Sequence, residues 1–301
     1  MAQKRILCVG NAVWDQIFIM ESLPVGAGKY FARTYIESGG GPAATAAVAI
    51  SRLGGAAKVW SRIGDDSPGD RIVAELESYG VEVPDLDRIK GVASSLAGIY
   101  VDDTGERIIV SYLDDKFPQG AEWLPLEEVR EYDCVLGDIR WPAGTEAVLK
   151  AAAEYGVPSV LDADRVPTRE ILHRLAPLAS HAVFSEGGLQ MYTGEHSPEA
   201  GLEKAAVLIK GIPFVTLGGD GCMWMRDGRL ERLAAFPVSV ADTTGAGDVF
   251  HGAFALALAE KMTLVDAARF ASATAALKCT KPGGRAGIPD RAALEGFLEK
   301  K

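Results

Sequence analysis

The 301-residue chain is 48% hydrophobic and 24% charged and contains 34 glycines, which is typical of a folded globular protein. Its formal net charge of −10 argues against nucleic acid and membrane surfaces as partners. The sequence contains no apolar run long enough to cross a membrane and no signal-peptide pattern at its N-terminus. Its four cysteines lack C-x-x-C spacing, which favours reduced thiols in a cytoplasmic protein.

Short apolar runs alternate with helical patterns along most of the chain. The runs predict mostly buried strands near residues 5–10, 57–64, 133–140, 158–164, 181–186 and 213–219. Helix signals lie between them: Ser67 as an N-cap with Gly80 as the stop, Ser197 as another N-cap, and Gly156 as another stop. This alternation predicts an α/β fold whose mainly parallel sheet is covered on both faces, with ligands at the carboxyl ends of the strands.

Two segments, 16–36 and 94–113, alternate apolar and polar residues around turn signals. They predict hairpins, which either extend a sheet edge or together form a small β-lid over a cleft, the interpretation we favour. We therefore expect one domain over residues 1–301 with the lid inserted in it.

The stretch "VADTTGAGDVFHGAFALALAE", residues 240–260, places a lone acid, Asp248, between a small-residue loop and an apolar helix. A helix N-terminus attracts anions, and Gly245, Ala246 and Gly247 let a phosphate approach the backbone. Asp248 could then take a proton from an alcohol while the loop stabilises a phosphoryl group. The alternative is purely structural, with the N-cap supplied by one of Asp242, Thr243 and Thr244.

A second glycine cluster, "ESGGGPAATAAVAISRLGG", also leads into a predicted helix. Gly39, Gly41 and Ala44 match a G-x-G-x-x-A dinucleotide fingerprint, so an NAD-dependent oxidoreductase is a remote alternative. Against it, Pro42 removes an N–H from the turn, and the preceding segment is predicted to belong to the lid rather than to the central sheet.

Together, "GGGPAATAAVAISRLGG" and "DTTGAGDVFHGAF" resemble the two signatures of the ribokinase-like (PfkB) sugar kinases, and the resemblance extends from "VGNAVWD" to "KPGGRAGIP". It implies a three-layer αβα sandwich with a β-lid, in which ATP phosphorylates a sugar hydroxyl. It also implies that Asp248 is the catalytic base and that Gly245, Ala246 and Gly247 form the anion hole.

The resemblance implies further roles for single residues. Sugar contacts fall on Asp15, Gly40, Gly41 and Thr45, where Thr45 departs from the usual Asn. The nucleotide side falls on Thr216, Gly218, Gly219, Gly221, Thr243, Ser272 and Ala276, with Ser272, Ala273 and Ala276 either forming a flat wall for adenine or simply packing closely. A monovalent cation such as K⁺ falls on Asp242, Thr244 and Gly283.

Phosphoryl transfer calls for Mg²⁺ to offset the charge of the nucleotide. Where the family usually carries an N-x-x-E motif for this metal, the chain has "SEGG", residues 185–188.

The expected substrate is an anionic sugar, because Lys29 and Arg33 lie in the first lid segment and Arg140 follows a strand. Each could instead be a solvated surface charge, the favoured view for Arg33. Further segments, including "LPVGAGKYFAR" and "ALKCTKPGGRAGIPD", resemble the sulfofructose kinase branch, which phosphorylates the 1-hydroxyl of 6-deoxy-6-sulfofructose. That resemblance implies sulfonate recognition by Lys29, Ser111 and Arg140.

Several alternatives remain open on the sequence. Fructose 6-phosphate, tagatose 6-phosphate and a catalytically silent sugar-binding regulator are among them. Dimerisation through the lid is common in the family and is expected here. His251, one turn beyond Asp248, either faces the cleft or, as we favour, packs against a neighbouring element.

Overall fold

The computed structural model describes residues 3–166 and 168–300. A large sheet contains β1 (Arg5–Val9), β4 (Ala56–Gly64), β5 (Leu86–Ile89), β8 (Cys134–Asp138), β9 (Ser159–Ala163), β10 (His181–Ser185), β11 (Ile212–Thr216), β12 (Cys222–Arg226) and β13 (Arg229–Leu233). Within the described residues its order is β13-β12-β11-β10-β9-β8-β1-β4-β5. All neighbours from β11 to β5 are parallel, while β12 and β13 are antiparallel additions.

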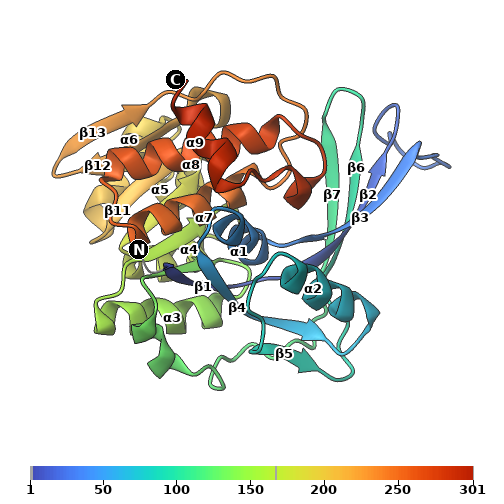
Figure 1. Ribbon diagram of the computed structural model, residues 1–301, viewed down its shortest axis with the longest axis horizontal. Coiled ribbons are helices and arrows are strands. Elements are labelled where there is room, and N and C mark those ends of the chain that lie inside the picture. The colour runs from blue at the N-terminus through green and yellow to red at the C-terminus, as the bar shows by residue number, and fades with distance from the viewer. Residues whose placement is uncertain (1–2, 167, 301) are drawn as a thin grey trace.

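Helices cover both faces of this sheet (Figure 1). One layer contains α1 (Pro42–Arg52), α2 (Ser67–Ser78), α7 (Ala246–Ala259), α8 (Leu264–Cys279) and α9 (Arg291–Leu298), and the other contains α3 (Pro142–Tyr155), α4 (Arg169–Leu175), α5 (Glu186–Thr193) and α6 (Pro198–Leu208). Short 3-10 helices complete the connections: η1 (Leu126–Glu131), η2 (Ala176–Leu178), η3 (Gly218–Asp220) and η4 (Gly284–Gly287).

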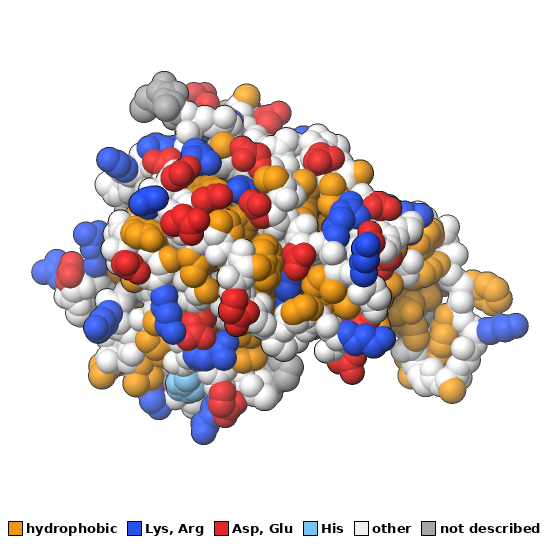
Figure 2. All heavy atoms as spheres, turned by 90° about the horizontal axis from the view of Figure 1, so that it is seen from below, with side chains coloured by type: hydrophobic (Ala, Val, Ile, Leu, Met, Phe, Trp, Pro, Cys, Tyr) orange, Lys and Arg blue, Asp and Glu red, His pale blue; other side chains and the backbone are white. Residues whose placement is uncertain are grey.

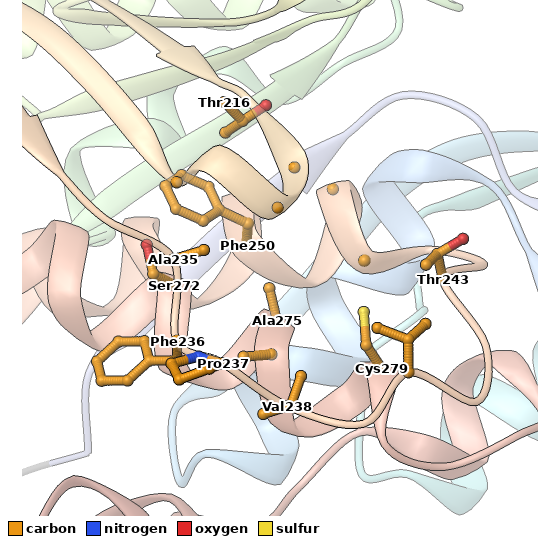
Figure 3. Close-up of a pocket in the computed structure, with 17 residues that line it drawn as sticks. Thr216, Ala235, Phe236, Pro237, Val238, Thr243, Phe250, Ser272, Ala275 and Cys279 are labelled. Atoms are coloured by element: carbon orange, nitrogen blue, oxygen red, sulfur yellow. The ribbon is translucent and has the colours of Figure 1, made fainter. Parts of the chain in front are cut away.

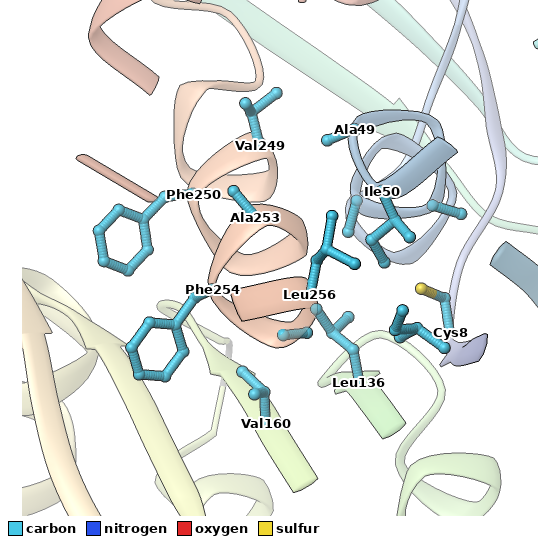
Figure 4. Close-up of a cluster of buried hydrophobic side chains, with 14 of the residues drawn as sticks. Cys8, Ala49, Ile50, Leu136, Val160, Val249, Phe250, Ala253, Phe254 and Leu256 are labelled. Carbon is cyan, nitrogen blue, oxygen red and sulfur yellow. The ribbon is translucent and has the colours of Figure 1, made fainter. Parts of the chain in front are cut away.

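The period-two pattern of the strands accounts for the three layers. In β1, Ile6 and Cys8 belong to the buried cluster under α1 and α7, whereas Leu7 and Val9 belong to the cluster under α3 to α6. In the first cluster, Leu256 of α7 lies beside Ile50 of α1 (Figure 4). The predicted three-layer fold is confirmed.

A separate sheet contains the predicted hairpin segments: β2 (Val13–Ile19), β3 (Thr34–Gly40), β6 (Leu96–Val101) and β7 (Arg107–Tyr112). Its order in the described chain is β3-β2-β6-β7, with both hairpins antiparallel and β2 parallel to β6. The sheet stands beside the carboxyl-terminal segments of the chain (Figure 1), and we call it the lid sheet.

The helix ends predicted from the sequence are confirmed, with a shift of one residue at the start of α2. Ser197 caps α6 and Gly156 ends α3 in the left-handed conformation. The N-cap of α2, however, is Asp66 and not Ser67, because the Asp66 carboxylate accepts the Gly69 N–H at 2.9 Å. None of the helices in the described residues combines the length and apolar character that crossing a bilayer requires.

Candidate active site

A cavity of about 460 Å³ lies between η3, the start of α7 and one face of α8 (Figure 3). All the residues predicted for the nucleotide side line it: Thr216, Gly218, Gly219, Gly221, Thr243, Ser272 and Ala276. Ala246 and Gly247 of the predicted anion hole line it as well. The cavity therefore brings the segment 216–221 and the loop before α7 together in one site.

One wall of the cavity is a helix face of small side chains. Ser272, Ala275, Ala276 and Cys279 follow the i, i+3, i+4, i+7 spacing of one face of α8. Of the two alternatives for Ala273, close packing is the correct one, because Ala273 belongs to the core and is fully buried. A smooth apolar wall of this kind suits the flat face of a nucleobase.

The opposite wall escaped the sequence analysis. It is formed by a stretch without regular structure after β13, whose lining residues are Ala235, Phe236, Pro237, Val238 and Val240. The stretch has neither helical nor strand periodicity, so only the position of its neighbours in the fold reveals its role.

The helix after the cavity begins without a side-chain cap. Its N-cap is Gly245, whose φ of 73° favours glycine, so the alternative N-caps Asp242, Thr243 and Thr244 are wrong. The Ala246 N–H donates to the Thr243 carbonyl at 3.2 Å, whereas no acceptor contacts the N–H groups of Gly247 and Asp248 among the described residues. These two free donors at the positive end of α7 can bind an anion.

Asp248 lies in the first turn of α7, near the carboxylates of Asp162, Asp138 and Asp164. Burial raises the pKa of Asp248 to about 7, and Asp162 adds to this rise while His251 opposes it. A carboxylate that titrates near neutral pH is suited to accept a proton from an alcohol. Its surroundings therefore agree with the base predicted from the sequence.

His251 is 5% exposed and packs against the central sheet, with Nδ1 3.2 Å from Oδ2 of Asp162 at the end of β9. Burial alone would lower the pKa of His251, but Asp162 and then Asp248 raise it overall. The Asp162 carboxylate therefore favours the protonated form of His251, which lies one turn beyond Asp248. No local signal linked His251 to Asp162, because the two residues are far apart in the chain.

The lid sheet and the start of α1 form the other side of the site. A Cβ at Gly40 would lie 2.1 Å from Oδ2 of Asp15, so only glycine leaves room for that carboxylate. Burial raises the pKa of Asp15 to about 7, although Arg285 works against the rise. Asp15 pairs with Ala97, which pairs with Ser111, so Asp15 and Ser111 share one face of the lid sheet about 10 Å apart.

A buried guanidinium that the sequence analysis missed organises this side. Arg285 of η4 is 1% exposed and donates to the Gly40 carbonyl at 2.7 Å, to Glu75 Oε2 at 2.9 Å and to Thr45 Oγ1 at 3.2 Å. Thr45 therefore accepts a hydrogen bond inside the protein, and its methyl group lies close to Gly245.

The cations predicted for an anionic sugar are not all brought together. The Arg140 N–H donates to Asp138 Oδ1 at 2.7 Å, and its Nη2 lies 3.5 Å from Asp164 Oδ2, close to Asp248. Lys29 lies in the exposed β2–β3 connection and has no hydrogen bond or ion pair with the described residues. That connection points away from the large sheet (Figure 1).

A residue of the lid sheet that the sequence analysis also missed contacts the large domain. Arg107, at the start of β7, donates from Nη1 to Thr243 Oγ1 at 2.7 Å. The lid sheet thus contacts the loop that leads into α7, next to the cavity.

The residues predicted to hold a monovalent cation do not fit a metal ion. The Asp242 carboxylate accepts N–H groups from Thr244 at 2.8 Å, Gly283 at 3.0 Å and Gly284 at 3.2 Å. Its backbone carbonyl accepts from Nζ of Lys278 at 2.9 Å. The Asp242 oxygens therefore already accept hydrogen bonds, one of them from the Lys278 ammonium.

In the described residues, no group of three or more His, Cys, Asp or Glu side chains could hold a metal ion. Ser185 of the "SEGG" stretch caps α5, because its Oγ accepts the Gly188 N–H at 3.0 Å and donates to Asp164 Oδ1 at 2.8 Å. This stretch therefore contributes a helix cap that holds Asp164.

The nicotinamide alternative is wrong on structural grounds. A dinucleotide fingerprint follows a strand of the central parallel sheet, whereas Gly39 and Gly40 are the last residues of β3 in the lid sheet and Gly41 comes directly after it. The cavity lies instead beside the loop that leads into α7, and Ala246 and Gly247 line it.

Residues 3–291 match the model of the family described as pfkB family carbohydrate kinase. A ribokinase of Haemophilus influenzae is 31% identical over 99% of both chains. Among solved structures, a putative ribokinase from Agrobacterium tumefaciens has 37% identity and a TM-score of 0.95, covering 99% of this chain and 98% of its own. Arabidopsis thaliana ribokinase, solved with ribose and ATP, has 26% identity and a TM-score of 0.87 over 99% of both chains.

Proposed function

The chain belongs to the pfkB family of carbohydrate kinases, and on that premise we propose that it transfers the terminal phosphoryl group of ATP to the 1-hydroxyl of 6-deoxy-6-sulfofructose. Phosphoryl transfer to a sugar alcohol is the chemistry of the family, and the identity of the sugar is the proposal. Free cysteines, three of them buried, support a cytoplasmic location.

The nucleotide would occupy the cavity beside α8, with its base against the small side chains and its terminal phosphate at Gly247 and Asp248. Mg²⁺ bound to the phosphates would offset their charge, and Asp164, exposed at the end of β9, would offer it a carboxylate. We leave K⁺ out of this proposal, because Nζ of Lys278 donates to the Asp242 carbonyl and lies 3.5 Å from its carboxylate.

The sugar would lie between the lid sheet and the start of α7, with hydroxyls on Asp15, Gly40 and Gly41. Asp248 would remove the proton of the 1-hydroxyl as that oxygen attacks the terminal phosphorus in line, while the N–H groups of α7 stabilise the transferred group. The lid would exclude water when it lies over the sugar.

The proposal of an anionic substrate rests on the guanidinium of Arg140. Its side chain is 38% exposed at the carboxyl end of β8, and its 3.5 Å pair with Asp164 is long, so it remains available to an anion. Ser111, on the same lid face as Asp15, would donate a hydrogen bond to that anion. Lys29 would reach it only by movement of the β2–β3 connection.

An assay of ADP release tests the substrate. We expect turnover of sulfofructose to exceed that of fructose 6-phosphate, tagatose 6-phosphate, fructose and ribose. Arg140→Ala should lower kcat/KM about 10- to 100-fold for the sulfonated and phosphorylated sugars, the value of one hydrogen bond to a charged group, and leave fructose nearly unchanged. Arg174→Ala, which removes an exposed partner of Glu146, is the control.

Two results would decide against this assignment. If the enzyme prefers a 6-phosphate sugar, the anion pocket stands but its ligand is a phosphate, with nearly two negative charges, and not a sulfonate, with one. If Arg140→Ala lowers kcat/KM equally for anionic and neutral sugars, Arg140 does not bind the anion and the proposed pocket is wrong.

We further propose that two copies pair through the lid sheet. Every residue of β7, its edge strand, is exposed, including Ile109 and Val110 at 50% and 59%. Apolar side chains also gather on the lid in Figure 2.

Sedimentation tests this pairing, and the wild type should have twice the mass of one chain. Val110→Glu should give monomers, whereas Val207→Glu on α6 should not change the mass. A monomeric wild type would contradict the pairing.

A further inference from the structure

A buried lysine holds the loop that leads into the anion-binding end of α7. Lys278, in the last turn of α8, is completely buried. Its Nζ donates to the backbone carbonyl of Asp242 at 2.9 Å and lies 3.5 Å from Oδ2 of the same residue. A single positive charge thus contacts one carbonyl oxygen and one carboxylate oxygen, the kind of oxygen ligands that a small cation takes.

The loop is tied to α8 and η4 at several further points. The N–H groups of Ala241 and Asp242 donate to the Cys279 carbonyl at 2.7 and 3.1 Å. The Asp242 carboxylate accepts from Gly283 and Gly284 on one side and from Thr244 on the other. Thr244 directly precedes Gly245, so the position of Asp242 fixes where α7 begins.

Without the ammonium, the partly buried Asp242 carboxylate would lie beside its own carbonyl with only hydrogen-bond donors to offset its charge. Breaking a buried ion pair by removing one partner leaves an uncompensated charge, which is strongly destabilising. Burial lowers the pKa of Lys278 and the Asp242 carboxylate counteracts that effect, since it favours the charged ammonium. Against the effect of burial, hydrogen bonds from Thr244 and then the Lys278 ammonium lower the pKa of Asp242, so both favour its ionised form.

We propose that the Lys278 ammonium is a built-in monovalent cation that positions the anion-binding loop, so that phosphoryl transfer by this enzyme requires no K⁺ or NH₄⁺. Lys278 is a positioning residue, since it contacts Asp242 and not the nucleotide or the sugar. The inference rests on the proposed kinase site but not on the choice of sugar.

The test compares initial rates in KCl and in tetramethylammonium chloride at equal ionic strength, with whichever sugar the enzyme phosphorylates. We expect equal rates for the wild type in the two salts. Lys278→Ala should lose about 10- to 100-fold in kcat/KM in tetramethylammonium, as expected for one charged hydrogen bond, and recover much of it in KCl or NH₄Cl. Lys281→Ala, which removes an exposed lysine of the same segment, should behave like the wild type.

Thermal unfolding gives a second readout that needs no substrate. K⁺ should raise the Tm of Lys278→Ala relative to tetramethylammonium and leave the wild-type Tm unchanged, because a ligand stabilises only the protein that binds it. If Lys278→Ala does not fold, Lys278→Met replaces it. Activation of the wild type by K⁺, or a variant that K⁺ neither rescues nor stabilises, would overturn the proposal even if sulfofructose proves to be the substrate.

Discussion

Asp248→Asn is expected to lower kcat for sugar phosphorylation by about 10²- to 10⁴-fold, the range that a positioned general base contributes. Asparagine has nearly the same shape but cannot accept the alcohol proton, so KM for ATP and sugar should change little. The variant should also be more stable above neutral pH, because it removes a carboxylate whose charge is disfavoured by burial and by Asp162. Steady-state kinetics and thermal unfolding measure the two effects.

The pH dependence of the wild type provides the matching check. The raised pKa of Asp248, about 7, means that the ionised base is lost as the pH falls through neutrality. Activity, measured as kcat/KM for the sugar, should therefore decline tenfold per pH unit on the acid side. Near-normal turnover by Asp248→Asn, or a wild-type rate that stays flat into acid, would contradict the assignment of the base.

Arg285→Met is expected to lower the free energy of unfolding by about 3–5 kcal/mol, the cost of leaving one charge of a buried pair without its partner. The guanidinium is 1% exposed, and its loss strands Glu75, the Gly40 carbonyl and the Thr45 hydroxyl. It would also raise the pKa of Asp15 further, because Arg285 is the cation that opposes that rise. Urea unfolding monitored by tryptophan fluorescence measures the change.

Two further variants separate this charge effect from loss of packing. Arg88→Ala, which breaks an exposed pair with Asp70, should cost about 1 kcal/mol or less. In the double variant Arg285→Met with Glu75→Gln, part of the stability should return because no unpaired charge remains. A loss below about 1 kcal/mol in Arg285→Met would show that the buried network contributes little.

Much of the fold followed from local patterns. Apolar runs of strand length, separated by helices with Ser, Pro and Gly at their ends, identify the parallel sheet and its two helix layers. The N-cap of α2 moved by one residue because Asp66 and Ser67 both suit that position, and only the geometry shows which oxygen meets the Gly69 N–H.

Many residues that line the cavity beside α8 were predicted, because the resemblance to the sugar kinases implied them. The residues that position the site through buried contacts were not predicted. Arg285 contacts Thr45, Lys278 contacts Asp242, and His251 contacts Asp162, all across long sequence separations. A buried lysine near the end of a helix, such as Lys278, resembles an ordinary exposed lysine in sequence.

The first lid hairpin joins the rest of the molecule through only three residues, 10–12, and the single residue Gly41. These two connections lie against each other, since a Cβ at Gly41 would be 2.4 Å from the Asn11 carbonyl oxygen. Asp15 and Gly40 therefore stand on strands that join the rest of the chain at one point, which Arg285 holds through the Gly40 carbonyl. A side chain at Gly41 would therefore displace β2 and β3 at once, and with them both Asp15 and Gly40.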